Sequence, residues 1–203
     1  MLLLTPRTPA RSELRVRDSR FLASALPIAN EDEARRERAA IGRSFPDATH
    51  HCWALRLHTP QGERERQDDA GEPAGTAGMP ILQAIRAAGI TNTLVVVARW
   101  FGGTKLGKGG LARAYRDAAR AALAQAGVVR TVPILRLMVC GGVALDGEAR
   151  HLIARCGGRI DGAFYAEIGV VRLTVSLPEA AADRLREELA HLSRGTWKVD
   201  IDS

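Results

Sequence analysis

The sequence predicts an α+β protein of two domains, an α/β domain over residues 13–130 and a ferredoxin-like βαββαβ domain over residues 134–203. Two observations predict this fold class. The continuous apolar run Thr93–Ala98 has the length of a buried central strand and lies between segments with helical apolar spacing. After Pro133 the order strand, helix, strand, strand, helix, strand begins anew, which is the split ferredoxin-like order. A chain of 203 residues has room for both domains.

The first elements predicted are an arm, a strand and a helix. Residues 1–12 hold two prolines and little apolar material, so we expect a loose arm. Residues 13–26 alternate in part and predict a strand or hairpin. Asn30, followed three residues later by Glu33, forms the pattern of a capping box, which predicts a charged helix over about 31–43 on the surface of a sheet.

A turn at Pro60-Gln61-Gly62 predicts a hairpin of residues 51–58 and 63–68. Alternation along the first of these strands predicts a core-facing set, which consists of His51, Trp53, Leu55 and Leu57. The run His50-His51-Cys52 invites a metal or nucleophile interpretation. Neighbouring strand residues point to opposite faces and cannot easily meet one ion, so we favour a structural role and predict no metal site.

Two helices flank the central strand. The apolar face of the first consists of Ile81, Leu82, Ile85 and Ala88, and Gly89 ends it. The second helix follows Gly110 and ends at Gly127. Its packing face comprises Leu111, Tyr115, Ala118 and Ala122, and its opposite face carries Arg113, Arg116 and Arg120.

The second domain repeats the alternation of strands and helices after the proline at 133. The predicted elements are, in order, a strand over 134–143, a helix capped by Asp146 that ends at Gly157, strands over 159–165 and 168–177, a helix after Pro178 that ends at Gly195, and a strand over 197–201. About 70 residues suffice for this arrangement, which therefore accounts for the rest of the chain.

The excess positive charge is concentrated in one segment. The whole chain has 29 Lys and Arg against 23 Asp and Glu, a net of +6, whereas residues 99–136 alone hold eight cations and one anion, a net of +7. Such clustering indicates an anionic partner, usually nucleic acid or phosphate. The alternative is a solvated helix face in a protein from an arginine-rich proteome. One hypothesis is therefore nucleic-acid binding by Arg113, Arg116 and Arg120.

Cysteine usage and hydropathy predict a cytoplasmic protein. The three cysteines form no disulfide framework and have no metal-type spacing, which fits a reducing compartment. No apolar run approaches the ~20 residues of a membrane helix, and the three leucines that follow Met1 are too short a run for a signal peptide. We therefore expect a soluble intracellular protein with no membrane partner.

A glycine-rich basic turn follows the central strand and opens the second helix. Its Gly102-x₄-Gly107-Lys108 matches the phosphate-loop pattern, but Gly109 stands where Ser or Thr should bind magnesium, so nucleotide hydrolysis is disfavoured. Lysines at a helix N-terminus are nevertheless well placed to hold an anion against free backbone N–H groups. The predicted anion site consists of Arg99, Gly102, Gly103, Lys105, Gly107, Lys108, Gly109 and Gly110.

An acidic loop that precedes the first of these helices carries Asp69, Glu72 and Thr76. Carboxylates in a cleft can act as general acid and base or bind magnesium. Because no nucleophile is identifiable, we favour helix capping, with Thr76 as N-cap, and pairing with an arginine such as Arg99. The sequence predicts no catalytic residue and no cofactor.

Two long motifs carry a family resemblance. Residues 69–78 read DAGEPAGTAG and residues 99–115 read RWFGGTKLGKGGLARAY, and they follow SRF at 19–21 and PDATHHC at 46–52. In this order they resemble the IMPACT family, including its bacterial YigZ-type members, over about residues 13–127. Ala70 stands where many members have a second Asp, which weakens any role that needs adjacent carboxylates there.

The resemblance implies an N-terminal domain of the ribosomal-protein type, also present in elongation factor G, and a C-terminal ferredoxin-like domain similar to that factor's last one. Eukaryotic members restrain a starvation-responsive translation kinase through an additional N-terminal partner-binding domain. Only about a dozen residues precede the motif region here, so we do not expect that partner.

Three functional hypotheses follow. The first is a translation-associated regulatory protein that binds RNA or the ribosome through the basic glycine-rich surface. The second is an enzyme or a phosphate- or nucleotide-binding protein whose site lies between the two glycine-rich loops, with Asp69, Glu72 and Thr76 facing Arg99, Lys105 and Lys108. The third is a protein-binding scaffold that uses the ferredoxin-like sheet, for which the sequence identifies no protein partner.

Overall fold

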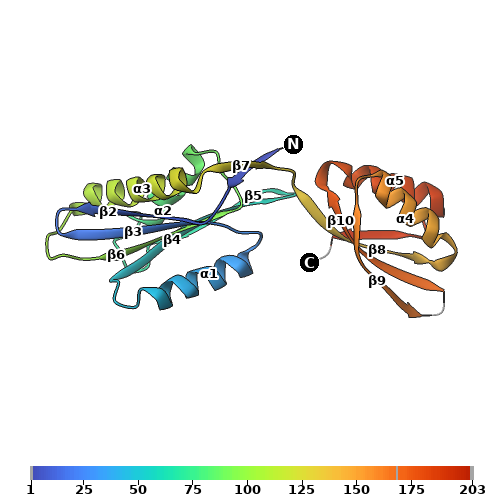
Figure 1. Ribbon diagram of the computed structural model, residues 1–203, viewed down its shortest axis with the longest axis horizontal. Coiled ribbons are helices and arrows are strands. Elements are labelled where there is room, and N and C mark those ends of the chain that lie inside the picture. Colours follow the sequence, from blue (N-terminus) through green and yellow to red (C-terminus); the bar gives the residue numbers. More distant parts are fainter. Residues whose placement is uncertain (1, 168, 202–203) are drawn as a thin grey trace. The chain divides into compact units, whose positions relative to one another are not determined.

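The computed structural model describes residues 2–167 and 169–201 and confirms a two-domain α+β protein (Figure 1). The chain forms two compact units, one over Leu3–Thr131 and one built from Val132 onward. Each unit has a hydrophobic core of its own. Among the described residues, no helix combines the length and the apolar character that crossing a lipid bilayer requires.

The first unit is built on a five-stranded antiparallel sheet with the strand order β2-β3-β6-β4-β5. Its strands are β2 (Ala10–Val16), β3 (Ser19–Pro27), β4 (His50–Thr59), β5 (Gly62–Asp68) and β6 (Thr93–Trp100). β6 is the central strand, and all its residues except the last are buried, which confirms the prediction from its apolar run.

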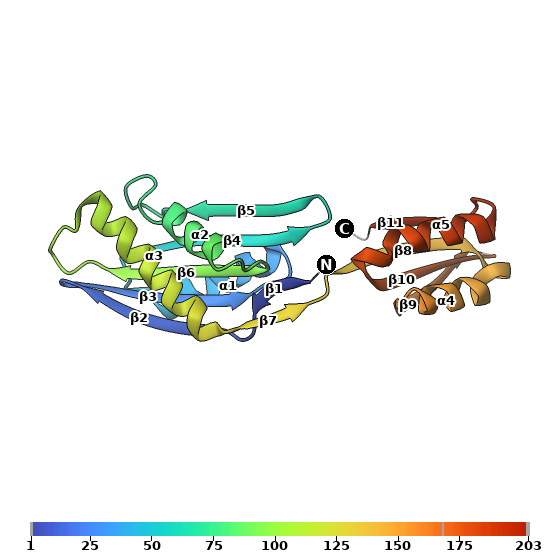
Figure 2. The same ribbon diagram turned by 90° about the horizontal axis from the view of Figure 1, so that it is seen from above.

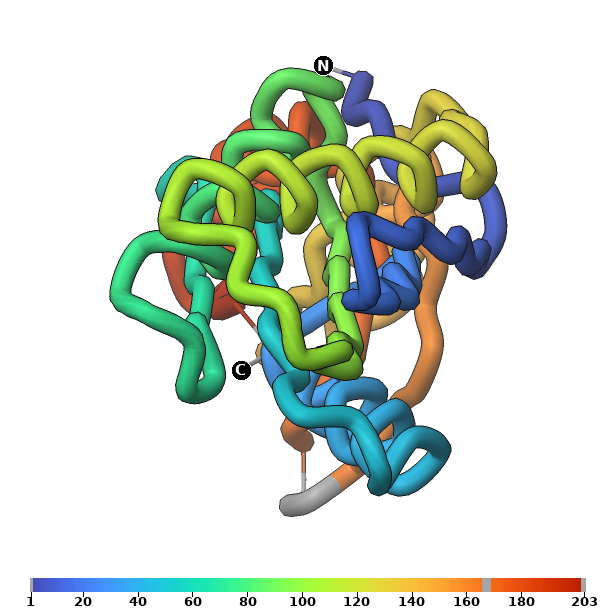
Figure 3. Tube along the Cα trace, turned by 90° about the vertical axis from the view of Figure 1, so that its left-hand side faces the viewer, coloured from blue at the N-terminus to red at the C-terminus, as the bar shows by residue number. Residues whose placement is uncertain are grey.

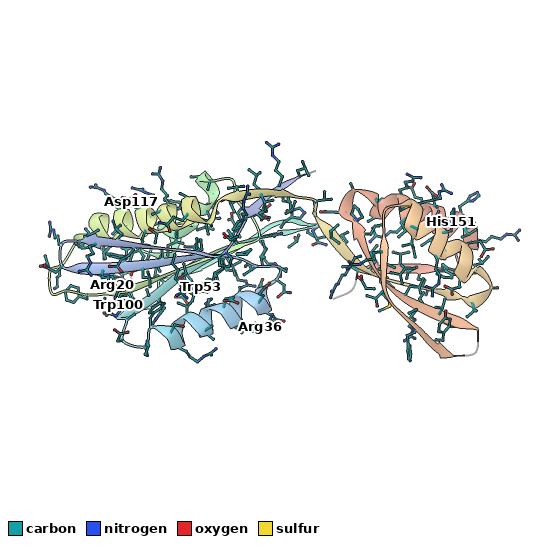
Figure 4. The ribbon with its side chains drawn as sticks, in the orientation of Figure 1. Arg20, Arg36, Trp53, Trp100, Asp117 and His151 are labelled. Atoms are coloured by element: carbon teal, nitrogen blue, oxygen red, sulfur yellow. The ribbon has the colours of Figure 1, made fainter. Side chains whose placement is uncertain are left out.

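Helices cover both faces of this sheet (Figures 1 and 3). α1 (Glu31–Ser44) lies on one face, and α2 (Gly78–Ala87) and α3 (Gly107–Ala126) lie on the other. Both faces of β4 are consequently buried. Trp53 packs in the core under α1 (Figure 4), whereas Cys52 and Ala54 pack in the larger core under α2 and α3. Alternation alone predicted a core on one face only, because small side chains give a weak hydrophobic signal.

The expected loose arm at residues 1–12 is wrong. β1 (Leu3–Pro6) pairs antiparallel with β7 (Val128–Thr131) in a separate two-stranded ribbon. The carbonyl of Leu4 also accepts the N–H of Thr91 at 2.9 Å. The prolines misled the prediction, because a proline at the end of an edge strand leaves the rest of the ladder intact.

The second unit has the predicted ferredoxin-like order. Its antiparallel sheet has the strand order β11-β8-β10-β9, with α4 and α5 packed on one face. The elements are β8 (Ile134–Gly142), η1 (Val143–Leu145), α4 (Asp146–Arg155), β9 (Arg159–Glu167), β10 (Val170–Pro178), η2 (Glu179–Ala181), α5 (Ala182–Ser193) and β11 (Lys198–Ile201). The expected start of the third strand, residue 168, lies outside the described residues.

The predicted capping role of Asp146 in the second unit is wrong. The 3-10 turn η1 leads directly into α4, so Leu145 occupies the cap position without a side-chain hydrogen bond. The Asp146 carboxylate instead accepts hydrogen bonds from Arg150 at 2.8 Å and from the Tyr165 hydroxyl at 3.1 Å. It therefore joins α4 to β9.

Candidate functional site

The acidic loop after β5 and the basic turn after β6 lie at the same end of the first unit (Figure 2). A pocket of about 430 Å³ lies between them, and both loops contribute to its lining. The residues that matter for its chemistry are His50 from β4, Glu72 and Pro73 from the acidic loop, Arg99 from β6, and Phe101, Lys105, Leu106, Lys108 and Leu111 from the basic turn and α3. The fold thus assembles two distant motifs into one concave site.

A larger cavity of about 660 Å³ lies between α4 and α5 in the second unit. Its lining includes His151, which is labelled in Figure 4, together with Glu148 and Arg155. None of the residues that the sequence predicts as site residues lines it. The smaller pocket of the first unit is therefore the better candidate, because charged groups from two motifs converge there.

Asp69 organises the acidic loop from inside and does not line the pocket. Its carboxylate accepts backbone N–H groups from Gly75 at 2.7 Å, Ala77 at 2.9 Å and Gly78 at 2.8 Å, and so caps α2. Burial raises the pKa of Asp69, but these donors together hold the pKa below its ordinary value. The prediction of Thr76 as N-cap is wrong, because its hydroxyl donates to a carbonyl within the loop.

Replacing Asp69 by Ala should lower the free energy of unfolding of the first unit by about 2 kcal/mol, because three N–H groups lose a charged acceptor. Asp69→Asn keeps an acceptor oxygen and should lose less than half as much. Urea unfolding at neutral pH measures both variants. Wild-type stability in Asp69→Ala would show that this carboxylate is not what holds the start of α2.

Beneath the pocket, a buried hydrogen-bond network joins the two loops. Glu72 Oε1 accepts Arg99 Nη1 at 2.5 Å and the Tyr115 hydroxyl at 2.7 Å. Arg99 Nη2 donates to Ser19 Oγ at 3.2 Å, and the Cys52 thiol lies 3.3 Å from Tyr115 Oη. The side chains of Glu72 and Arg99 are only 3% and 6% exposed. The predicted pairing of the acidic loop with Arg99 is therefore confirmed for Glu72.

Burial is the main cause of the raised pKa values of Cys52 and Tyr115 in this network. Desolvation raises the pKa of Cys52 to about 12, and the surrounding carboxylates act in the same direction. Desolvation and the neighbouring thiol and carboxylate also raise the pKa of Tyr115 well above its ordinary value. Both groups are neutral at pH 7, so Cys52 is not an activated nucleophile.

The side chains of the His50-His51-Cys52 run have separate partners. The carbonyls next to them belong to Ala70, Phe45 and Asp69, at 2.9, 3.0 and 3.0 Å respectively. A carbonyl can only accept, so Nδ1 of His50 carries a proton. The other ring nitrogen of His50, Nε2, lies 4.0 Å from Glu72 Oε1 at the pocket.

The glycines of the basic turn have different roles. Gly102 packs against the backbone of the turn between β2 and β3, which leaves no room for a Cβ. Gly103 and Gly107 have φ values of +98° and +70°, which favour glycine. Gly109 and Gly110 lie in the first turn of α3. In the part of the chain that the structure describes, Gly107 is the glycine of this set that lines the pocket.

Five cations follow one another from the basic turn along α3, namely Lys105, Lys108, Arg113, Arg116 and Arg120. Within residues 2–167 and 169–201, none of the five is in an ion pair. Arg116 and Arg120 also line a cavity of about 370 Å³ beside α2. The acidic residue of α3, Asp117, is exposed on the outer side of the helix (Figure 4). We call these five residues the α3 cation row.

Sequence reasoning missed two groups of the site. Tyr115 was expected only to pack, yet its hydroxyl connects Glu72 to Cys52. A signal was present, since a lone hydroxyl on an alanine-rich buried helix face usually has a polar partner. His50 was assigned a structural role, yet it also lines the pocket. Nothing local indicates this, because its position depends on a loop 20 residues away.

Comparison with known proteins covers both units. The family model for the Impact N-terminal domain matches residues 17–123, and that for a domain of unknown function, DUF1949, matches residues 145–196. A protein of Escherichia coli strain K12 named IMPACT family member YigZ is 32% identical over 198 residues, which span 97% of this chain and 96% of that protein.

Two further comparisons agree with these matches. An IMPACT family member of Thermus thermophilus, from the pol 5′ region, is 48% identical over 111 residues, which span 55% of this chain and 58% of that protein. A crystal structure described as that of a hypothetical protein superposes with a TM-score of 0.74 at 29% identity, and the match covers 100% of this chain and 98% of that one. Both units therefore have counterparts in one solved chain.

Proposed function

The chain belongs to the IMPACT family, and from this premise we propose that it acts in the regulation of translation by binding RNA, free or within the ribosome, through the α3 cation row. The family resemblance supports translation as the process, because it implies domains of the ribosomal-protein and elongation-factor type. The proposal places the protein in the cytoplasm. The charge of α3 supports RNA as the partner.

The observation that carries this proposal is the run of five cations, from the basic turn along α3, that have no ion-pair partner in the described part of the chain. Some arginines elsewhere in the first unit do face carboxylates: Arg64 and Arg66 pair with Glu31, and Arg86 pairs with Glu65. Those charges are neutralised within the protein. The α3 cation row has no such partner among the described residues, so its charge is available to an external anion.

The geometry of α3 suits a phosphate backbone. Arg113, Arg116 and Arg120 are spaced at three and four residues and therefore share one side of the helix. The two lysines extend this row toward the helix N-terminus, where free N–H groups also attract anions. Contacts of this kind hold a phosphate chain without reading its bases. Affinity should therefore depend steeply on salt and little on sequence.

Replacing Arg113, Arg116 and Arg120 by Gln should weaken RNA binding by about tenfold or more at about 50 mM salt. Each lost phosphate contact removes about 0.7 to 0.9 from the slope of log K against log salt, so the slope should flatten by about 2 to 3. Fluorescence anisotropy with a mixed-sequence RNA hairpin, repeated between about 50 and about 200 mM salt, measures both quantities.

A matched triple variant separates the α3 cation row from net charge. Arg35, Arg36 and Arg43 lie on α1, on the opposite face of the sheet, and Arg36 is labelled in Figure 4. Their replacement by Gln removes the same charge and should leave both affinity and slope near the wild-type values. Equal losses in the two triple variants, or no RNA binding by the wild type at low salt, would contradict the proposal.

A further inference from the structure

We propose that the pocket between the acidic loop and the start of α3 binds a nucleoside 5′-monophosphate unit whose base carries an exocyclic amino group. This site is distinct from the arginines of the α3 cation row. The same chemical unit occurs as a free nucleotide and as an unpaired residue of an RNA chain. The floor, the rim and the walls of the pocket each support one part of this ligand.

The floor of the pocket has hydrogen-bond acceptor atoms to which no described residue donates. Glu72 Oε1 already accepts two hydrogen bonds, from Arg99 and Tyr115. Its second oxygen, Oε2, accepts no hydrogen bond from the described residues. Glu72 lines the pocket, and its side chain is 3% exposed. A carboxylate oxygen without a donor favours a ligand that brings N–H groups.

His50 presents a second acceptor beside it. Because Nδ1 donates to the carbonyl of Ala70, the neutral ring has its lone pair on Nε2, which lies 4.0 Å from Oε1 of Glu72. An amino group has two N–H bonds and can donate one to each of these acceptors. A carbonyl oxygen in the same place would set its lone pairs against the carboxylate. The floor therefore distinguishes an amino-bearing base from a base with an oxygen at that position.

The rim of the pocket suits a phosphate. Lys105 and Lys108 stand at the N-terminus of α3, which has no side-chain cap. Cations at this end of a helix are disfavoured unless an anion lies between them and the N–H groups. The buried acceptors of the floor are an independent sign of a ligand, since they do not depend on the helix.

The walls of the pocket suit the faces of a base and a sugar. Phe101 is 45% exposed, and Pro73, Leu106 and Leu111 line the same space. An exposed aromatic ring provides a stacking surface for a base. The volume of about 430 Å³ lies within the range of small-ligand pockets. The pocket thus has hydrogen-bond acceptors at its floor, cations at its rim and an aromatic ring in its wall. This combination fits a nucleotide better than it fits inorganic phosphate.

The decisive comparison uses CMP and UMP, which are nearly equal in size. Cytosine has an amino group at C4 and an acceptor nitrogen at N3, whereas uracil has a carbonyl at C4 and an N–H group at N3. Isothermal titration of the full chain should show saturable CMP binding, with UMP and inorganic phosphate at least about tenfold weaker. Lys105→Gln with Lys108→Gln should weaken CMP binding about tenfold or more. Phe101→Ala, a change at an exposed side chain, should also weaken it.

The matched control is Arg113→Gln with Arg120→Gln, which removes the same charge from positions of α3 outside the pocket. CMP binding should survive in this control even if RNA binding is lost, so the pocket and the proposed function can fail separately. Oligocytidylate that displaces CMP identifies an RNA residue as the occupant, and CMP binding without displacement identifies a free nucleotide. Absence of CMP binding, or equal affinity for CMP and UMP, overturns the proposal.

Discussion

Arg99→Leu should lower the free energy of unfolding of the first unit by about 3 to 5 kcal/mol. The substitution leaves the Glu72 carboxylate buried without its cation, and removing one partner of a buried ion pair has a cost of this order. The remaining donor to Glu72, the Tyr115 hydroxyl, cannot neutralise the charge. Urea unfolding monitored by tryptophan fluorescence reports this unit through Trp53 and Trp100 and the second unit through Trp197.

The double variant Arg99→Leu with Glu72→Gln tests whether the isolated charge of Glu72 causes this loss of stability. The amide that replaces the carboxylate keeps an acceptor for Tyr115 but carries no charge, so the double variant should be about 2 kcal/mol more stable than Arg99→Leu alone. Arg113→Leu, at an exposed position on α3, should change stability by no more than about 0.5 kcal/mol. A double variant no more stable than Arg99→Leu would attribute the loss to packing rather than to an isolated charge.

The fold was largely predictable because its elements carry local signals. The capping box of α1 is present, with Asn30 Oδ1 accepting the N–H of Glu33 at 2.9 Å. The apolar run of β6 and the strand order of the second unit also agree with prediction. The ribbon of β1 and β7 was not predictable locally. It depends on pairing between segments more than 120 residues apart, which no short-range pattern encodes.

The motifs of the candidate site were predictable, but the positions of its side-chain atoms were not. Both glycine loops were identified, and Glu72 and Arg99 do meet. Whether a carboxylate faces the pocket or the loop interior depends on backbone geometry, which turned Asp69 toward three N–H groups and left Glu72 at the pocket. In the sequence, a carboxylate in an acidic glycine-rich loop looks the same whether it faces a ligand or caps a helix. Only the path of the loop distinguishes a ligand-facing acid from a capping acid.

The first unit should also lose stability steeply above pH 9, because unfolding there releases protons that the folded protein retains. The pKa of Cys52 is raised from its ordinary value of 9.0 to about 12. The folded thiol keeps its proton between these values, whereas the unfolded thiol loses it. Stability is therefore full below pH 9 and falls as pH rises toward 12, by about 1.4 kcal/mol per pH unit for one group.

Cys52→Ser isolates this contribution, since a hydroxyl of similar shape does not titrate in this range. The difference in stability between wild type and variant near pH 7 reports only the change in packing and hydrogen bonding. From about pH 9 to about pH 11 the stability of wild type minus that of the variant should fall by about 2 kcal/mol, because wild type alone loses the thiol contribution. Tyr115 is expected to cancel, because desolvation is the main cause of its raised pKa and keeps the hydroxyl protonated in both folded proteins over this range. Parallel curves across this range would mean that the thiol ionises as readily in the folded unit as in the unfolded chain. The buried network beneath the pocket would then be open to water.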